Sequence, residues 1–244
     1  MKKNNILFFL CLCSAMGAAA QNWPEVKPEA RPGSRWWWLG SAVDKDNLNY
    51  NLKEYGKAGL GSLEVTPIYG VKGNESHNLC FLSPEWMEMF RYTQEVGKTN
   101  GIDIDMNTGT GWPFGGPEVS LSQAAAKAIF ECYEVKGGEP VKLEINIRDP
   151  KEQKQRDVAY LDCLMAYGTD GKVVNLTKKV KDGYLQWDAP AGDWQLVALF
   201  VGRTFQKVKR AAPGGEGYVM DHFSPVSVKS YFEKFDKAFK TNKV

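Results

Sequence analysis

Histidine is scarce in this chain, and there is little excess of charge of either sign. His77 and His222 are the two histidines among 244 residues, which argues against a transition-metal site built from imidazole ligands. The formal net charge is +2, and removal of Lys2 and Lys3 with the N-terminal segment discussed below leaves 29 basic against 29 acidic residues. A neutral chain without a basic run lacks the electrostatic surface that attracts nucleic acid or an anionic membrane. We therefore expect neither as a partner.

Cysteine is also sparse, with five residues in all. Cys11 and Cys13 lie in the N-terminal segment, and Cys80, Cys132 and Cys163 remain, odd in number and far apart. This spacing is neither that of a disulfide framework nor that of a zinc knuckle. One pair could still form in an oxidising compartment, and the sequence leaves this open. An oxygen-liganded cation such as calcium also stays open at this point.

The sequence lacks a hydrophobic run long enough to span a bilayer. Its apolar run at 6–13 (ILFFLCLC) is short, follows two lysines and precedes three alanines that end at Ala20. This order is typical of a cleavable secretory signal. We expect residues 1–20 to be removed near Ala20, giving a mature protein that begins near Gln21. The predicted location is the periplasm or the cell exterior, without a membrane anchor.

Strand and helix patterns alternate in residues 35–131. The predicted strands are 35–41, 62–69 and 102–107, and the predicted helices begin after Asp44, after Ser83 and after Ser120 or Ser122, ending near Ala58, Thr99 and Phe130. Each helix start has a side chain that can cap free backbone N–H groups, and Pro84 adds a favoured first residue. Repeated alternation of this kind favours a parallel sheet, either open or closed as a barrel.

A different pattern begins at residue 132. Residues 132–215 hold several short alternating segments separated by glycine-containing turns, which indicate an inserted small antiparallel β-domain. The first pattern returns in residues 216–244, with a predicted strand at 218–222 and a helix that starts at Ser224.

The predicted fold class is therefore α/β. About four strand–helix units form part of a (β/α)8 TIM-type barrel after an extended lead-in at 21–34, and the β-domain interrupts them. Four units do not close an eight-stranded barrel, which takes about 250 residues without insertions. We expect the chain to be the front part of a longer protein, truncated within the barrel.

Eight tryptophans suggest a binding surface, because exposed indole rings are costly unless they pack or bind. Trp36 and Trp38 share one face of the first strand, and Trp38, nearest the strand end, is predicted to line a pocket. Asn107 at the end of the third strand and Trp112 in a glycine-rich loop form a second candidate pair. An amide can exchange hydrogen bonds with sugar hydroxyls, and an indole can cover the apolar side of a pyranose. A structural loop with a packed tryptophan is the alternative.

The sequence allows more than one role for several acidic residues. Asp221, at the end of the predicted fourth strand, is a candidate sugar or cation ligand, or else a turn acid for the helix that follows. His222 beside it is a candidate hydroxyl ligand or a structural histidine. Glu64 inside the second strand favours a buried ion pair. Asp103 and Asp105 share a face, which favours a solvated or helix-facing position because two buried unpaired carboxylates are costly.

Several motifs together resemble the start of the bacterial α-L-rhamnosidases of glycoside hydrolase family 106. They are RWWW at 35–38, AGLG at 58–61, LSPEW at 82–86, GWPFGGP at 111–117, and GYVMD at 217–221 with Ser224. Their order and spacing match over most of the mature chain, including the inserted β-domain.

The resemblance implies an exported enzyme with an interrupted (β/α)8 catalytic domain. Such enzymes cleave terminal L-rhamnose from polysaccharides with a pair of carboxylates, and calcium has been associated with their site. The resemblance also implies that the catalytic acid and base lie beyond Val244, so this chain alone is expected to be inactive, with no cofactor or metal ligand of its own. The expected partner is an oligo- or polysaccharide. Two alternatives remain, a carbohydrate-binding module and an inactive remnant of a truncated gene.

Overall fold

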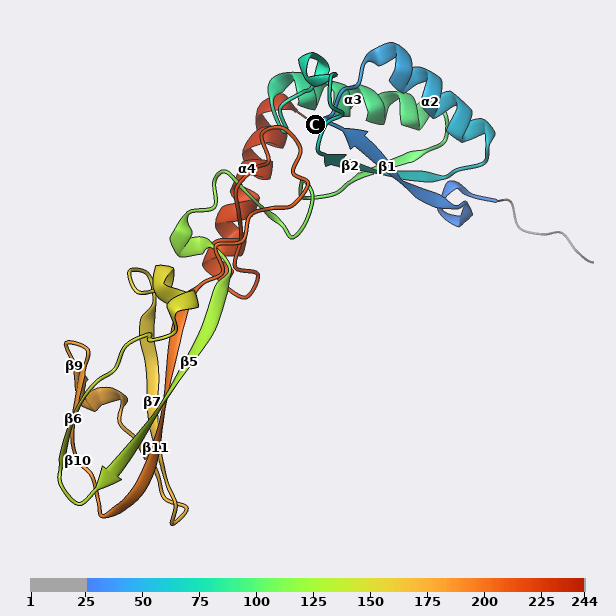
Figure 1. Ribbon diagram of the computed structural model, residues 1–244. Coiled ribbons are helices and arrows are strands. Elements are labelled where there is room, and N and C mark those ends of the chain that lie inside the picture. The colour runs from blue at the N-terminus through green and yellow to red at the C-terminus, as the bar shows by residue number, and fades with distance from the viewer. Residues whose placement is uncertain (1–25, 244) are drawn as a thin grey trace, which may run out of the picture.

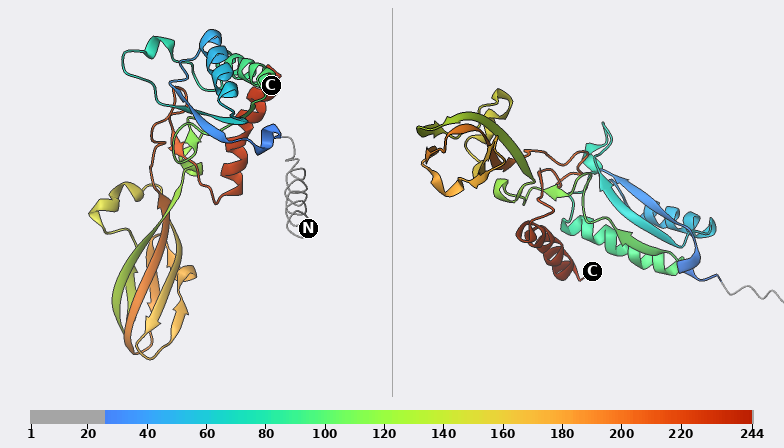
Figure 2. Two further views of the ribbon diagram at one scale, coloured as in Figure 1. Left: turned by 90° about the vertical axis from the view of Figure 1, so that its right-hand side faces the viewer. Right: turned by 90° about the horizontal axis from the view of Figure 1, so that it is seen from below.

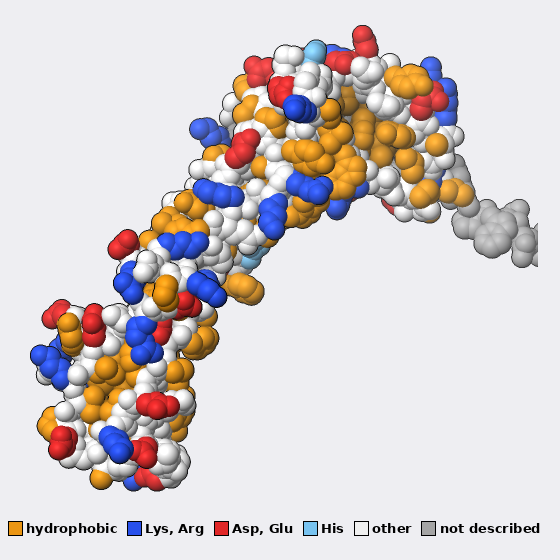
Figure 3. Space-filling view, viewed as in Figure 1, with side chains coloured by type: hydrophobic (Ala, Val, Ile, Leu, Met, Phe, Trp, Pro, Cys, Tyr) orange, Lys and Arg blue, Asp and Glu red, His pale blue; other side chains and the backbone are white. Residues whose placement is uncertain are grey.

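The protein has two lobes arranged end to end. The computed structural model describes residues 26–243, so the predicted signal at 1–20 lies outside the described residues. An α/β lobe (26–125 and 204–243) continues through two long strands into a β lobe (126–203), and the molecule bends where they join (Figure 1). Two further views and the space-filling surface show the same extended outline (Figures 2 and 3).

The α/β lobe contains a three-stranded parallel sheet. Its elements run in the order β1 (Gly33–Leu39), α2 (Lys45–Lys57), β2 (Ser62–Ile68), α3 (Pro84–Thr99) and β3 (Asp103–Met106), with β2 in the middle of the sheet. The helices α2 and α3 lie on one face of this sheet (Figure 1). Within residues 26–243, no helix covers the opposite face. The first part of the predicted strand–helix alternation is thus confirmed.

Local capping explains where these helices begin. The Asp44 carboxylate accepts a hydrogen bond from the backbone N–H of Asn47 at 2.9 Å, and the Ser83 hydroxyl accepts one from the N–H of Trp86 at 3.2 Å. Each bond satisfies an N–H group that the first helical turn leaves free. Pro84 follows Ser83 as the first helical residue, where its fixed φ suits the helix.

The tryptophans of β1 alternate between the two faces of the sheet, as predicted. Trp38 packs against Trp86 of α3, with ring centroids 5.7 Å apart, and Trp36 packs against Tyr55 of α2 at 5.5 Å. Trp86 in turn stacks on Phe90 at 5.4 Å. These aromatic contacts form the core between sheet and helices, and they leave Trp37 on the uncovered face.

The predicted helix at 120–130 is wrong. Residues Leu121–Gln123 form one 3-10 turn, and β5 (Ala126–Gly137) follows directly. The alanines give these residues helix propensity, but the propensity is worth only a few tenths of a kcal/mol per residue. Twelve register pairs with β11 (Gly192–Arg203) outweigh this propensity, and Ile129, Glu131 and Tyr133 of β5 are buried on one face. The domain boundary predicted at residue 132 falls inside β5.

The predicted fourth parallel strand at 218–222 is also wrong. β12 (Tyr218–Val219) pairs antiparallel with β4 (Gly115–Gly116), outside the parallel sheet. A Cβ on Gly115 would lie 2.1 Å from the carbonyl oxygen of Tyr218, so this close pairing depends on glycine. The described residues therefore form a mixed α/β fold with open sheets, and a partial barrel is not confirmed. The helix predicted after Ser224 is present as α4 (Pro225–Asn242).

The β lobe consists of two sheets that enclose a core. The four-stranded sheet has the order β5-β11-β7-β8, and a three-stranded sheet has the order β6-β10-β9. The remaining strands are β6 (Pro140–Glu144), β7 (Tyr160–Gly168), β8 (Val173–Asn175), β9 (Val180–Lys181) and β10 (Tyr184–Asp188). Further 3-10 turns in the described chain are Pro28–Ala30, Glu75–His77, Pro150–Gln155 and Thr177–Lys179.

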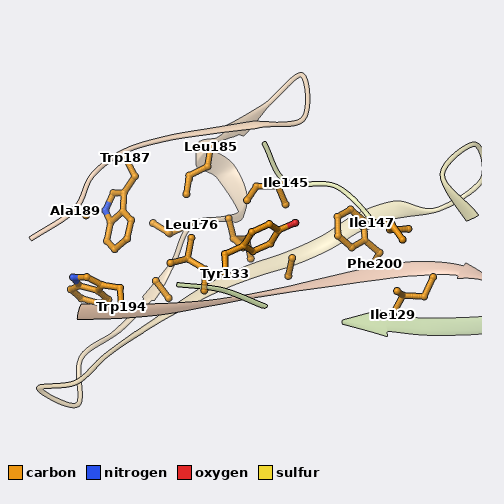
Figure 4. Packing of buried hydrophobic residues seen from close by; sticks show 14 residues of the cluster. Ile129, Tyr133, Ile145, Ile147, Leu176, Leu185, Trp187, Ala189, Trp194 and Phe200 are labelled. Atoms are coloured by element: carbon orange, nitrogen blue, oxygen red, sulfur yellow. The ribbon is translucent and has the colours of Figure 1, made fainter. Parts of the chain in front are cut away.

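Aliphatic residues and four aromatic residues fill the centre of the β lobe (Figure 4). Trp187 and Trp194 meet edge to face at 5.1 Å at one end of this core. Further along, the hydroxyl of Tyr133 donates to the carbonyl oxygen of Asn146 at 2.8 Å, so its polar atom is satisfied although the ring is buried. The β lobe therefore has a core of its own, separate from that of the α/β lobe.

The three cysteines in the described residues are free. Cys80 lies in the α/β lobe, while Cys132 and Cys163 lie on β5 and β7, which the strand β11 separates. The sequence left open whether two of these cysteines form a disulfide, and in this structure none of them does.

Candidate functional site

Loops from distant parts of the chain converge where the parallel strands end. β1, β2 and β3 end at the same edge of the sheet, which is where ligands bind in open α/β sheets. The segment before β12 folds back over this edge. The N–H of Tyr69 donates to the carbonyl oxygen of Arg210 at 3.0 Å, and Trp112 exchanges two backbone hydrogen bonds with Lys209, at 3.0 and 2.8 Å.

Three aromatic side chains are exposed at this edge. Trp37, Tyr69 and Trp112 keep 42%, 43% and 39% of their surface in solvent. Trp37 and Trp112 meet edge to face, with centroids 5.7 Å apart, and the guanidinium of Arg210 lies over the ring of Tyr69 at 5.6 Å. Figure 3 shows hydrophobic side chains gathered in the region where β1 and β2 end, with basic side chains beside them. We call Trp37, Tyr69, Trp112 and Arg210 the aromatic edge.

A glycine holds Trp112 in this position. Gly111 has a φ of +86°, and a Cβ there would lie 2.1 Å from the carbonyl oxygen of Lys209. The loop can therefore approach Lys209 closely enough to form the two backbone hydrogen bonds only without a side chain at residue 111. The backbone of Trp112 is fixed in this way while its ring stays exposed.

Asn107 lies beside the aromatic edge, at the end of β3. Its N–H donates to the carbonyl oxygen of Val65 at 2.9 Å, which extends the ladder between β2 and β3 by one residue. Its side chain is buried, and no hydrogen bond of the amide group occurs among the described residues. The amide donors and acceptor of Asn107 thus remain available.

Charged residues form a row across the uncovered face of the sheet. Arg35, Glu64 and Asp105 are register partners on adjacent strands. Arg35 donates to the Glu64 carboxylate at 2.9 Å and lies over the ring of Trp37 at 5.4 Å. The predicted ion pair of Glu64 is present but only half-buried. Asp103 and Asp105 are exposed, which confirms the expected solvated position.

Trp38 lies next to a cavity whose wall includes Trp37 of the aromatic edge but not Trp112. It is 1% exposed and belongs to the core, although it also contributes to the wall of a cavity of about 340 Å³ at the free edge of β1. Asn47, Asn51 and Asn74 add amide groups to that wall. The Nε1 atom of Trp38 is buried without a hydrogen-bond partner in the described part of the chain. Trp38 and Trp112 therefore do not share one surface.

Asp221 and His222 follow β12, which pairs with β4, so they do not lie at the end of a strand of the parallel sheet as predicted. The Asp221 carboxylate accepts a hydrogen bond from the N–H of Phe223 at 3.0 Å, and its backbone N–H donates to the carbonyl oxygen of Gln123 at 2.9 Å. Arg203 lies 4.0 Å from the same carboxylate. These are the contacts of a turn acid before α4. His222 is exposed.

The described residues were expected to hold no metal ligand, and their acidic, histidine and cysteine side chains form no cluster. Residues 26–243 contain no group of three or more histidine, cysteine, aspartate or glutamate side chains arranged to hold one. We therefore assign no residue here to calcium. Among the helices of this part, none combines the length and the apolar composition that a bilayer span requires.

Trp37, Tyr69 and Arg210 are the site residues that sequence reasoning missed, since Trp38 was chosen as the tryptophan of the first strand. Tyr69 is the last residue of the second predicted strand (62–69), so its place at a strand end was a usable signal. Arg210 had no local signal, since it reaches the edge through a loop that follows the β lobe.

Exposed aromatic rings next to amide and cationic groups are typical of proteins that bind saccharides. Comparison with known sequences agrees with that class. The chain belongs to the α-L-rhamnosidase family, glycoside hydrolase family 106, whose profile matches residues 25–171 and 165–243.

Two longer proteins are similar to this chain. One, from Formosa agariphila, bears the name "Putative beta-glucuronidase" and is 24% identical over 243 residues, which cover 84% of this chain and 21% of that protein. The other is the solved structure of a rhamnosidase from Novosphingobium sp. PP1Y, with a TM-score of 0.61 and 14% identity. The match between the two structures covers 89% of this chain and 37% of the rhamnosidase, and at 14% identity it shows a similar fold. The chain thus spans about a fifth of the curated relative.

Proposed function

We propose that this chain is the N-terminal part of an exported glycoside hydrolase that acts on terminal α-L-rhamnose in plant or bacterial polysaccharides. Its three parallel strands form the beginning of a (β/α)8 barrel, and its aromatic edge forms part of the sugar-binding rim. The catalytic carboxylates lie beyond Val244. Membership of the α-L-rhamnosidase family supports the reaction class, and the aromatic edge is the observation that supports the place of binding.

The chemistry of rhamnose suits this surface. Rhamnose carries a methyl group where most hexoses carry a hydroxymethyl group, so one side of its ring is apolar. The exposed rings of Trp37 and Trp112 offer an apolar wall for that side, where burial of nonpolar surface favours binding. The free amide of Asn107 and the guanidinium of Arg210 can then form hydrogen bonds with the ring hydroxyls.

The acids near this surface do not provide the usual catalytic pair. Glycoside hydrolysis needs one carboxyl group that donates a proton and a second that acts as base or nucleophile. Glu64 is neutralised by Arg35, and its register partner Asp105 is exposed on the open sheet face without a second free carboxylate as its partner in the row. For this reason we propose that the described residues bind and orient the sugar but do not cleave it.

Two measurements on the purified chain test this proposal. Titration with methyl α-L-rhamnopyranoside is expected to quench tryptophan fluorescence, and an aryl α-L-rhamnoside is expected to remain uncleaved. Absence of quenching would contradict the binding role, and release of the aryl group would contradict the place given to the carboxylates. Expression with the native N-terminus in a Gram-negative host is expected to give an exported protein that begins near Gln21.

A terminal uronate is a second candidate sugar. Arg210 lies over Tyr69, and Lys209 precedes it in the same loop, so positive charge flanks the aromatic edge. An arginine can bind a sugar carboxylate through two parallel hydrogen bonds. The name of the Formosa agariphila relative points the same way. Stronger quenching by methyl β-D-glucuronide than by the rhamnoside would favour this candidate.

A further inference from the structure

The β lobe has a groove of its own at the end far from the aromatic edge. It measures about 590 Å³ and lies where β5, β11 and β7 meet. Ligand pockets of proteins commonly range from about 300 to 1,000 Å³. The side chains that form its polar wall are Glu134, Lys136, Tyr167, Thr169, Asp193 and Gln195. Neither the family comparison nor the aromatic edge accounts for this groove.

Three of these side chains form a row across the sheet. Gln195 on β11 is the register partner of Glu134 on β5 and of Tyr167 on β7. Neighbouring partners place their Cβ atoms about 5 Å apart on the same face. A ligand in the groove therefore lies across the face of three strands, contacting side chains, and does not add to a sheet edge as an extended peptide would.

Trp194 stiffens the sheet from its inner face, opposite the side chains of the groove. Its ring is buried, donates from Nε1 to the carbonyl oxygen of Pro190 at 2.8 Å, and packs against Trp187 at 5.1 Å (Figure 4). A Cβ on Gly168 would lie 3.1 Å from the ring, and one on Gly137 would lie equally close. The absence of side chains at these two positions lets the indole pack closely against the inner face of the sheet that carries the groove.

Four polar side chains of the wall have no partner in the part of the chain that the structure describes. Among the described residues, no hydrogen bond or ion pair involves the side chains of Glu134, Lys136, Asp193 or Gln195. Their donors and acceptors are thus free to bind a hydroxyl-rich ligand. Tyr167, which is 44% exposed, adds an aromatic ring to the same wall. One aromatic ring among unpaired amide, carboxylate and ammonium groups matches the alternating apolar and hydroxyl surfaces of a sugar.

The net negative charge of the groove disfavours acidic sugars. Glu134 and Asp193 contribute two negative charges against the one positive charge of Lys136. A uronate would bring a further negative charge into this groove, which like-charge repulsion disfavours. A neutral saccharide has no such cost.

We propose that this groove is a second saccharide-binding site, specific for neutral oligosaccharide segments of a polymer. The ring of Tyr167 packs on one sugar residue, and Gln195 and Glu134 bond its hydroxyls. Because the groove lies at the end of the β lobe that is far from the α/β lobe, the site holds a polymer at a distance from the sugar bound at the aromatic edge (Figure 1). Its existence does not depend on which sugar the aromatic edge binds.

Affinity electrophoresis of the whole chain tests this site. Native gels containing galactan, arabinan, xyloglucan or galactomannan are compared with a gel that contains no polysaccharide. We expect at least one of these neutral polymers to retard the protein, and the Tyr167→Ala and Gln195→Ala variants to lose the retardation. Two controls should keep it: Tyr160→Ala, an exposed tyrosine of the same strand outside the groove, and Trp112→Ala at the aromatic edge.

The outcomes separate this site from the proposed function. Retardation that Trp112→Ala abolishes and Tyr167→Ala preserves would overturn the second site and leave the aromatic edge intact. Absence of retardation in all four gels would also overturn it. Near-UV circular dichroism of the Trp187 and Trp194 pair should be unchanged in Tyr167→Ala and Gln195→Ala, since both substituted side chains lie on the outer face of the sheet.

Discussion

The indole rings of Trp37 and Trp112 meet edge to face, with their centroids 5.7 Å apart. Trp37 belongs to β1 and Trp112 to the loop after β3, so the contact spans the two outer strands of the parallel sheet. It joins the ends of these strands on the uncovered face, where two exposed rings together offer a larger apolar wall than either alone.

This contact leads to a prediction for saccharide binding. Trp112→Ala and Trp37→Ala should each weaken binding of methyl α-L-rhamnopyranoside by about 2- to 10-fold, since an aromatic contact contributes roughly 0.5–1.5 kcal/mol beyond buried area. The double variant should lose less binding free energy than the sum of the two single losses, because each ring positions the other. Titration calorimetry measures all three, with Phe223→Ala, which is 98% exposed, as the matched control. If both single variants bind the rhamnoside with the affinity of the parent, the aromatic edge is not part of the binding site.

Gly111 should be far less tolerant of substitution than another glycine with nearly the same backbone conformation. Gly111→Ala and Gly171→Ala both place alanine at a positive φ, +86° and +83°, which costs about 1–2 kcal/mol. A Cβ on Gly171 meets nothing within 4 Å, whereas on Gly111 it meets the carbonyl oxygen of Lys209. Urea unfolding should show a larger loss for Gly111→Ala, together with weaker rhamnoside binding, while Gly171→Ala keeps its affinity. Equal losses would mean that the close approach to Lys209 is not required.

Trp86 anchors the core of the α/β lobe. It is fully buried, stacks on Phe90, and donates from Nε1 to the hydroxyl of Ser41 at 2.9 Å. Trp86→Ala should destabilise this lobe by about 3–5 kcal/mol through the cavity it leaves, whereas Trp86→Phe keeps part of the packing and loses the hydrogen bond. The β lobe has a separate core, so its unfolding should shift less than that of the α/β lobe. The measurement is urea unfolding followed by tryptophan fluorescence and by far-UV circular dichroism.

Features encoded by neighbouring residues were predictable from the sequence. The starts of α2, α3 and α4 follow from capping side chains at Asp44, Ser83 and Ser224, and the alternating faces of β1 follow from the period of a strand. The motifs that resemble the α-L-rhamnosidases led to the correct family.

Features that depend on distant partners were not predictable in this way. The alanine-rich start of β5 is a strand because β11 pairs with it, and the residues at 218–222 turn away from the parallel sheet because β12 pairs with β4. The same limit applies to the candidate site. The glycine-rich loop pointed to Trp112 in the sequence. No local pattern pointed to Arg210, which contacts Tyr69 only in the folded chain. Asp221 forms turn contacts because the strand before it, β12, pairs with β4 and not with the parallel sheet.

The stability of the β lobe should depend on pH through Glu131. This carboxylate accepts hydrogen bonds from the N–H of Arg148 at 2.7 Å, the Nε of Arg148 at 3.0 Å and the N–H of Asp149 at 3.2 Å. Burial alone would raise the pKa of Glu131, but these hydrogen bonds and the charge of Arg148 outweigh burial and lower the pKa below its ordinary value. A lowered carboxyl pKa stabilises the folded state above the unfolded pKa, near 4.5, and this contribution is lost as pH falls through the folded value.

Glu131→Gln should therefore be less stable than the parent at pH 7, by about 2 kcal/mol for the loss of charge-assisted hydrogen bonds. The difference should shrink as pH falls below about 4.5, because the parent carboxyl then becomes protonated and loses the same interaction. Urea unfolding at a series of pH values measures this, with Glu144→Gln, an exposed acid on the neighbouring strand β6, as the control that should show no such trend. A stability difference that stays constant from pH 7 to pH 3 would mean that Glu131 holds Arg148 in place without a pKa that differs between the folded and unfolded states.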